Sequence, residues 1–491
     1  MRDAALAMTA DEFRALGHRL VDRIAEHLRA LPLRPVACGE PPSHVRNALG
    51  SARNLPNDGV DAARALTEAA DLLFDHSTFN GHPRFLAYIT SSPAPIGVLG
   101  DFLASAINQN MGAWKLAPMA TEIEAQTVRW IAELVGFPSD CGGLLVSGGN
   151  MANFVCFLAA RAAKAGWDVR KSGFAGESRS LAVYASTETH TWLQKAADLF
   201  GLGTDAIRWI AVDGGQRMVP SALRDRIADD RSRGIRPFMV VGTAGSVSTG
   251  AVDPLPELAE ICREFDLWFH VDGAYGALAA QVPGAPEALR GLSEADSVAV
   301  DPHKWLYAPL EAGCVLLRHA KHLRDAFSYH PAYYHFDDDV LNYFDYGPQN
   351  SRGFRALKVW LGLRQAGRAG YLQMIGDDIS LARRLHNRLQ NREDFEATSQ
   401  SLSVTTFRYV PSDLRARLGS PEVEPYLNTL NQELLTRVEK SGELFLSNAT
   451  IGQMFTLRAC IVNFNTSAED IDALPELLSR LGRQADKALR A

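Results

Sequence analysis

Between residues 96 and 317 the chain alternates between short apolar runs and longer segments with apolar residues at helical spacing. The short runs are rich in β-branched and aromatic residues, which favours buried strands, whereas the longer segments predict amphipathic helices. We expect a strand and turn at 144–149 and strands at 180–185, 207–212, 238–242, 267–272, 297–300 and 314–317, with helices between them. Such alternation predicts an α/β fold with a mostly parallel sheet covered by helices on both faces.

The two ends of the chain have different patterns. Thr9 and Glu12 match a capping box, and apolar residues follow at helical spacing as far as residue 28. The proline- and glycine-rich segment 32–59 separates this helix from a second one at 61–74. The first helix therefore either packs on its own domain or forms a partner-facing arm.

Between residues 327 and 353 the hydrophobic periodicity of helices and strands disappears. A long aperiodic segment of this kind is typical of a functional loop or lid. A helix at 354–365 follows. After it, a helix, strands at 404–409 and 456–463, and a final helix at 468–489 predict a small α+β domain. We expect an N-terminal helical segment at 1–80, a large α/β domain at 81–365 and the small domain at 366–491.

Composition excludes several classes of protein. The chain has 491 residues, which is long enough for more than one domain. Its net charge is −7, so it lacks the positive potential that would attract nucleic acid or anionic membranes. The six cysteines are scattered without C-x-x-C pairs, as in reduced cytosolic proteins. No secretory signal or bilayer-spanning apolar run is present. We expect a soluble, cytoplasmic protein with no nucleic-acid or membrane partner.

Charged residues directly follow two of the predicted strands. Asp272 ends one strand, and Asp301, His303 and Lys304 follow another. Ligands of open α/β sheets bind at the carboxyl ends of the strands. Pyridoxal phosphate requires a lysine for a Schiff base and an acid partner for its ring nitrogen, so these residues indicate that cofactor.

Each of these residues also has a simpler explanation. Lys304 could be a strand-end lysine with its ammonium group in solvent, and Asp272 could cap the glycine-containing turn that follows it. His190, His270, Asp272 and His303 could be metal ligands, but their spacing matches no metal motif such as H-E-x-x-H. The lysine and the carboxylate at two strand ends favour a cofactor site, and we expect no metal.

Three further positions support this interpretation. The segment 147–150 (Ser-Gly-Gly-Asn) joins a predicted strand to a helix, where glycines and the helix dipole favour a phosphate. His190 follows another strand and could stack on a cofactor or transfer a proton. Thr243 ends a third strand. Taken singly, these are a packing turn, a helix start and a turn residue, but with Lys304 they indicate one site.

Together the motifs resemble the group II pyridoxal-phosphate decarboxylases, the family of aromatic-L-amino-acid decarboxylase. They occur in the family's order across nearly the whole chain, at residues 82–85, 117–122, 147–150, 242–245, 270–275, 301–305 and 354–360. The resemblance implies a type I, aspartate-aminotransferase-like fold and pyridoxal 5'-phosphate as the cofactor. It also implies a homodimer with shared active sites, in which segment 1–80 takes part in dimerisation.

The resemblance further implies a role for individual residues. Lys304 would bind the cofactor as a Schiff base, Asp272 would pair with its ring nitrogen, and His190 would stack on the ring. The other implied cofactor-binding residues are Gly149, Asn150, Thr243, Ala274, Asp301, His303 and, from the other subunit, Ser351. The implied substrate residues are Tyr88, Ser91, Trp192 and Arg458, and the implied catalytic proton donor is Tyr333 or Tyr334.

Three departures from the family pattern leave the exact amino acid unspecified. Asp301 stands where the family often has asparagine, Asn150 and Met151 replace the usual serine or glutamate, and Trp192 replaces a small residue. We expect decarboxylation of an aromatic L-amino acid to its amine and CO2.

The alternatives are oxidative decarboxylation to an aldehyde, decarboxylation of an acidic amino acid, and a metal-dependent hydrolase that uses the histidines. Tyrosine at both 333 and 334 favours simple decarboxylation over the aldehyde-forming reaction. In the stretch around residues 84–93 Arg84 is the only basic residue, which disfavours an acidic substrate.

Overall fold

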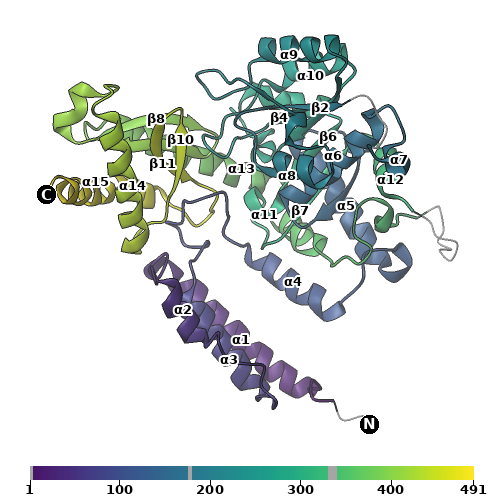
Figure 1. Cartoon of the computed structure of the whole chain (residues 1–491). Coiled ribbons are helices and arrows are strands. Elements are labelled where there is room, and N and C mark those ends of the chain that lie inside the picture. The colour runs from purple at the N-terminus through teal and green to yellow at the C-terminus, as the bar shows by residue number, and fades with distance from the viewer. Residues whose placement is uncertain (1–3, 175–179, 330–339) are drawn as a thin grey trace.

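The computed structural model describes residues 4–174, 180–329 and 340–491, so Tyr333 and Tyr334 lie outside the described residues. A helical arm at the N-terminus, a large α/β part and a small α+β part follow one another along the chain (Figure 1). All six cysteines are unpaired. Within the described ranges, no helix has both the length and the apolar character needed to cross a membrane.

A seven-stranded sheet forms the centre of the large part, and it confirms the predicted α/β fold. Its strands lie in the order β1-β7-β6-β5-β4-β2-β3. Only β7 runs antiparallel to its neighbours, β1 and β6, so the other six strands all point in one direction. The strands are β1 (Gly142–Val146), β2 (Leu181–Ser186), β3 (Ile207–Ile210), β4 (Arg236–Thr243), β5 (Trp268–Asp272), β6 (Ser297–Val300) and β7 (Gly313–Leu317).

Helices cover both faces of this sheet, and the strand residues alternate between two cores because successive side chains point to opposite faces. In β1, Leu144 and Val146 pack in one core with α6 and α8, whereas Leu145 packs in the other core with α5, α9 and α10. The helices of this part are α5 (Pro118–Val135), α6 (Gly149–Lys164), α7 (Val169–Ser172), α8 (Trp192–Leu199), α9 (Pro220–Ser232), α10 (Leu255–Glu264), α11 (Pro302–Trp305) and α12 (Lys321–Phe327).

The small part has a four-stranded antiparallel sheet in the order β10-β11-β9-β8, which packs with three helices around a third core. Its elements are α13 (Ala356–Gln390), β8 (Phe395–Ser401), β9 (Val404–Tyr409), α14 (Glu424–Ser441), β10 (Ser447–Ile451), β11 (Met454–Cys460) and α15 (Ala468–Arg490). α13 consists of two helical segments joined by non-helical backbone at Gly367, where φ is 63°, two residues after the expected domain limit at residue 365, but no comparison tests that limit. The limits of the domains therefore stay a prediction.

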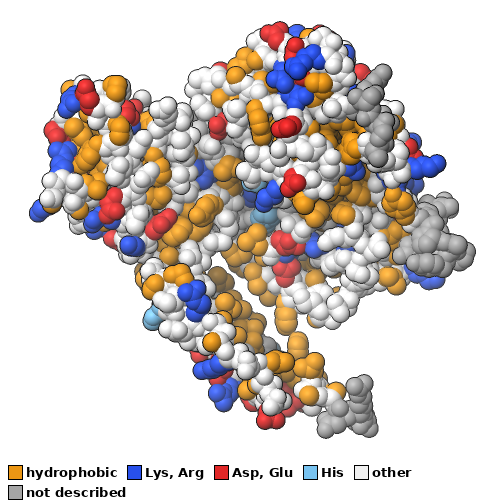
Figure 2. All heavy atoms as spheres, viewed as in Figure 1, with side chains coloured by type: hydrophobic (Ala, Val, Ile, Leu, Met, Phe, Trp, Pro, Cys, Tyr) orange, Lys and Arg blue, Asp and Glu red, His pale blue; other side chains and the backbone are white. Residues whose placement is uncertain are grey.

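The N-terminal arm consists of α1 (Ala10–Ala30), α2 (Pro42–Leu49) and α3 (Ala62–His76), and it projects from the body (Figure 1). The Thr9–Glu12 capping box is present. None of the residues of α1 is buried, although its apolar stripe includes Phe13 and Leu28. This stripe and Phe102 of α4 (Pro95–Ile107) line an apolar groove of about 910 Å³. Figure 2 shows apolar side chains along the arm on the side that faces the body.

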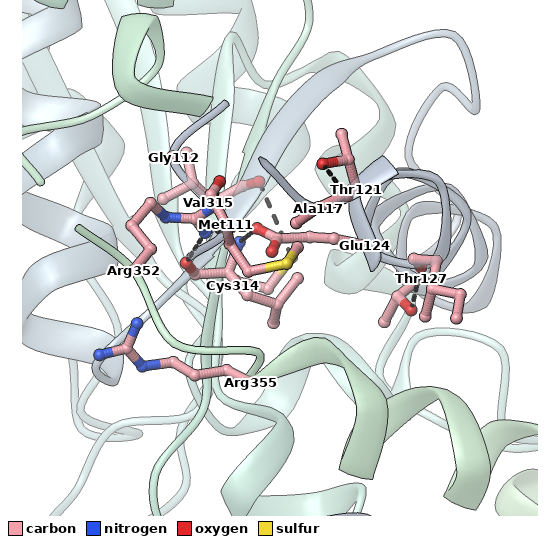
Figure 3. A network of polar contacts seen from close by, with 12 residues as sticks. Met111, Gly112, Ala117, Thr121, Glu124, Thr127, Cys314, Val315, Arg352 and Arg355 are labelled. Carbon is pink, nitrogen blue, oxygen red and sulfur yellow. Dashed lines mark hydrogen bonds and ion pairs between the residues drawn. The ribbon is translucent and has the colours of Figure 1, made fainter. Parts of the chain in front are cut away.

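A buried ion pair fixes the segment that carries Ser351. Figure 3 shows Arg352 and Glu124 pointing toward each other, and Arg352 Nη2 donates to Glu124 Oε1 and to the carbonyl of Leu145 in β1. Glu124 Oε1 also accepts the backbone N–H of Leu145 at 2.8 Å. Both charged side chains are almost fully buried, at 1% and 0% exposure. Residues 350–352 are therefore held against the strand that leads into the glycine turn.

Candidate active site

The carboxyl ends of β1, β2, β4, β5 and β6 meet at one edge of the sheet, because these strands are mutually parallel. Each of these strand ends leads into one of the predicted site residues: Gly149, His190, Thr243, Asp272 and Lys304. In the register of β4 and β5, Thr243 lies directly opposite Asp272. The parallel topology therefore brings together residues that are far apart in the sequence.

Lys304 lies in the single turn of α11, beside a buried carboxylate. Its Nζ is 3.1 Å from Asp301 Oδ2, and His303 Nε2 is 3.8 Å from the same oxygen. The other oxygen, Asp301 Oδ1, is buried and has no hydrogen-bond partner among the described residues. A buried acceptor without a donor is costly, so this oxygen is suited to receive a hydrogen bond from a bound group.

The turn before α6 has the properties of an anion site. Gly148 has φ 104°, and α6 begins at Gly149 without any side-chain cap, so its first N–H groups are left for a ligand. A Cβ atom on Gly149 would lie 2.6 Å from Asp301 Oδ2, and one on Gly148 would lie 3.4 Å from the ring of His303. Asn150 is the second residue of this helix. Glycine is therefore required here by close packing as well as by φ.

Asp272 ends β5 and is held by two donors. Its Oδ2 accepts a hydrogen bond from the indole Nε1 of Trp192 at 2.8 Å, and its Oδ1 accepts one from the backbone N–H of Ala274 at 3.2 Å. Trp192 is completely buried and contacts the ring of His270 edge-on, with 5.7 Å between the centroids. The buried indole N–H needs an acceptor and finds it in Asp272. The expected place of Trp192 in the wall of the substrate pocket stays a prediction.

Two more strand-end residues complete this edge. Burial lowers the pKa of His190 below its usual value; Lys304 adds to this effect, whereas Asp272 opposes it, so the imidazole is neutral at pH 7. The backbone N–H of Thr243 donates to Asp253 Oδ2 at 2.8 Å. Burial raises the pKa of Asp253 to about 6. This aspartate fixes the end of β4, and no sequence motif indicated it.

His270 has a structural role, which removes it from the metal site considered above. Its Nδ1 lies 2.9 Å from Ser297 Oγ and its Nε2 lies 2.7 Å from Asn153 Oδ1, so both ring nitrogens are occupied. Complete burial lowers its pKa to about 4. In the part of the chain that the structure describes, no three of His190, His270, Asp272 and His303 bring their ligand atoms within 4.8 Å of one another.

The residues implied for the substrate lie around the segment 88–91. Ser91 Oγ donates to the carbonyl of His303 at 2.8 Å, next to Lys304. Tyr88 has φ 54°, and its side chain is 60% exposed. Arg458 is buried beneath it and donates from Nη1 to the carbonyl of Tyr88 at 3.2 Å. Arg458 therefore contacts the backbone that presents Tyr88.

Asp378 is a buried residue near the site that the sequence analysis missed. Its Oδ2 accepts hydrogen bonds from Trp305 Nε1 and Tyr307 OH, both at 2.8 Å. Burial raises its pKa to about 7. Trp305 also stacks on Tyr275 with 4.6 Å between the ring centroids. Asp378 thereby fixes the residues that follow Lys304, from a helix about 70 positions away along the chain.

These residues fit pyridoxal phosphate. Lys304 can bind its aldehyde, and Asp272 is a fixed carboxylate suited to a pyridinium nitrogen. The uncapped start of α6 can hold the phosphate, and Asp301 Oδ1 is left without a donor. Ser351 is exposed on its anchored segment.

Known proteins are similar to nearly the whole length of this chain. A model of the pyridoxal-dependent decarboxylase conserved domain matches residues 42–410. Aromatic-L-amino-acid decarboxylase of Bacillus atrophaeus is 35% identical over 471 residues, which cover 95% of this chain and 94% of the relative. 4-hydroxyphenylacetaldehyde synthase of Rhodiola rosea is 30% identical, covering 94% and 92%. The crystal structure of Oryza sativa TDC with PLP and tryptamine has a TM-score of 0.89 and 26% identity, covering 98% of this chain and 99% of that chain. The chain belongs to the family of pyridoxal-dependent decarboxylases.

Proposed function

We propose that this protein is a cytoplasmic homodimer that decarboxylates an aromatic L-amino acid to its amine and CO2. The observation that carries this proposal is the placement of Lys304 and Asp272 at the ends of neighbouring parallel strands, with the uncapped start of α6 at the same edge. The relatives named above include enzymes of aromatic amino acids, which supports the substrate class.

The cofactor and the chain divide the chemistry. When bound, pyridoxal phosphate supplies a sink for the electron pair that remains when the Cα–carboxylate bond breaks and CO2 leaves. Lys304 holds the cofactor, and Asp272, fixed by the indole of Trp192, keeps a proton on the ring nitrogen. The neutral imidazole of His190 offers a flat ring for stacking without adding a positive charge. Tyr333 or Tyr334 then returns a proton to Cα.

The charges near the site support an aromatic rather than an acidic substrate. Arg84 is already paired with Asp470, with 3.1 Å between Nε and Oδ1. Arg458 is only 1% exposed, and its Nη1 already donates to the carbonyl of Tyr88 and to Ser447 Oγ. The exposed ring of Tyr88 provides an apolar face, and aromatic pairs contribute about 0.5–1.5 kcal/mol beyond the area that they bury.

Two features support the homodimer. The apolar stripe of α1 contains no buried residue, and with α4 it lines the 910 Å³ groove, an apolar surface of the kind that marks an interface. Ser351 is held rigidly by the neighbouring Arg352–Glu124 pair, as a residue contributed to the site of another subunit should be.

The test is a panel of aromatic and acidic L-amino acids with CO2, amine, aldehyde and hydrogen peroxide all measured. We expect equimolar CO2 and amine from an aromatic substrate, with neither aldehyde nor peroxide. Lys304→Ala should lose turnover and the visible absorption of lysine-bound cofactor, whereas Lys321→Ala, at an exposed lysine of α12, should retain both. Turnover in Lys304→Ala, or activity restricted to acidic substrates, would refute the proposal. Sedimentation of the loaded protein as a monomer would refute the dimer.

A further inference from the structure

Two histidines and a glutamate converge where the arm joins the body, away from the candidate active site. Glu40 precedes α2, His44 lies within α2, and His76 ends α3. Glu40 Oε2 is 2.7 Å from His76 Nδ1, and Glu40 Oε1 is 3.4 Å from His44 Nε2. One ligand atom from each residue lies within 4.8 Å of the other two, and no other group of His, Cys, Asp or Glu in the described ranges does this.

The spacing of these atoms matches metal coordination. Zinc binds imidazole nitrogen and carboxylate oxygen at about 2.0–2.2 Å, so neighbouring ligand atoms of a tetrahedral site lie about 3.3 Å apart. The 3.4 Å from Glu40 Oε1 to His44 Nε2 is close to this spacing, whereas the 2.7 Å from Glu40 Oε2 to His76 Nδ1 is about 0.6 Å shorter. The two distances involve different carboxylate oxygens, so an ion bound through one oxygen requires the Glu40 carboxylate to turn. Small side-chain rotations are enough for such a change, because the three residues are partly exposed.

The position of the three residues is held by the surrounding backbone. The N–H of Val36 donates to the carbonyl of Gly442 in the small part at 2.8 Å, and the N–H of Phe79 donates to the carbonyl of Val36 at 2.9 Å. Glu40 follows the first of these anchors by four residues, and His76 precedes Phe79 by three. In Figure 1, α2 lies at the end of the arm that is nearer the small part. The ligands are therefore preorganised across segments that are separate in the sequence.

We propose that Glu40, His44 and His76 form a binding site for a divalent transition metal, with zinc as the best fit, that joins α2 to the end of α3. Two imidazoles and one carboxylate suit zinc, and three protein ligands leave the fourth position to water. The side chain of His44 is 60% exposed, which provides a path for the ion to enter. A bound ion would link the proline- and glycine-rich segment 32–59 to the C-terminal end of α3.

A simple ion pair is the competing explanation, since the Glu40 carboxylate can accept hydrogen bonds from both imidazoles without a metal. Titration calorimetry with zinc chloride alone, on full-length cofactor-loaded protein freed of metal, separates the two. We expect one zinc per chain, and at least tenfold weaker binding in His44→Ala and in His76→Ala. Cobalt(II) should give visible bands of a tetrahedral site in the wild-type protein and lose them in both variants.

Matched controls make the assignment specific. His319 and His322 are another facing pair, with 6.1 Å between ring centroids, and His319→Ala should bind zinc like the wild type. Cys38 is an exposed thiol in the same segment, and Cys38→Ser should also bind normally. Circular dichroism and cofactor absorption should be unchanged in every variant.

The absence of stoichiometric zinc binding would overturn the site, as would binding that survives in His44→Ala and His76→Ala or is lost in Cys38→Ser. The result does not depend on the decarboxylase activity, since no step of that reaction involves these residues.

Discussion

Replacing Asp378 with asparagine should make the stability of this protein less dependent on pH. The Asp378 side chain is 2% exposed and accepts hydrogen bonds from Trp305 and Tyr307, the residues that follow Lys304. Asparagine has nearly the same shape, carries no charge at any pH, and keeps an amide oxygen that can accept from the same two donors. The variant therefore removes the ionisation of residue 378 while keeping its place in the packing.

The magnitude follows from the pKa of Asp378, which burial raises from 3.8 to about 7. Above pH 3.8 the unfolded chain has lost this proton and the folded chain has kept it, so stability falls as the pH rises through this interval. At about 1.4 kcal/mol per pKa unit, the loss totals about 4 kcal/mol, and it is complete above the folded pKa. About 3 kcal/mol of this loss in stability occurs as the pH rises from about 5 to above the folded pKa.

The assay is urea unfolding of wild type and Asp378→Asn at about pH 5 and about pH 8, with saturating cofactor. The free energy of unfolding of the variant, relative to wild type, should rise by up to about 3 kcal/mol between the two conditions. Asp225→Asn is the control, because it makes the same change at an exposed position of α9 whose charge does not contribute to the raised pKa of Asp378. The pKa of Asp253 is also raised, to about 6, but this residue is present in all three proteins, so its contribution cancels when the variants are compared with wild type. An equal difference at both pH values, or the same rise in Asp225→Asn, would refute the reasoning.

Two further predictions concern the fixed carboxylates. Trp192→Phe removes one of the two donors to Asp272, a bond to a charged group worth about 1.5–3 kcal/mol, so cofactor affinity should fall about tenfold or more in reconstitution titrations. Unchanged affinity would show that Asp272 does not need the indole. Arg352→Met leaves Glu124 buried and unpaired, which should lower the free energy of unfolding by about 3–5 kcal/mol in urea. The double variant Glu124→Gln/Arg352→Met should lose less, and an equal or greater loss would contradict this explanation.

The large sheet and most of its helices could be predicted because local patterns specify them. The strands of the large part are almost entirely buried, so they appear in the sequence as apolar runs. In the small part, β9 (Val404–Tyr409) was predicted at its observed bounds. The edge strand β8 was missed, since its residues Phe395–Ser401 are mostly polar and only one is buried. The direction of β7 was also not evident, because a buried strand has the same composition in either orientation.

The candidate site likewise contains residues that could be predicted from the sequence and contacts that could not. Asp272, Lys304 and the glycine turn could be found because charged or glycine residues interrupt apolar runs at strand ends. The hydrogen bond from Trp192 to Asp272 was not predicted, since a tryptophan on a helix gives no indication of which acceptor its N–H will meet. Asp378 gave no signal, because its partners lie about 70 residues away.

The sequence by itself determined the α/β class, the strand ends that carry the chemistry and the family to which the chain is similar, because hydrophobic periodicity and short motifs are local properties. Only the tertiary structure decided which distant side chains meet. It buried the Glu124–Arg352 pair beside β1, fixed the residues after Lys304 through Asp378, and brought Glu40, His44 and His76 to one point. Each of these contacts joins separate segments, and its energy comes from desolvation and packing that no local pattern records.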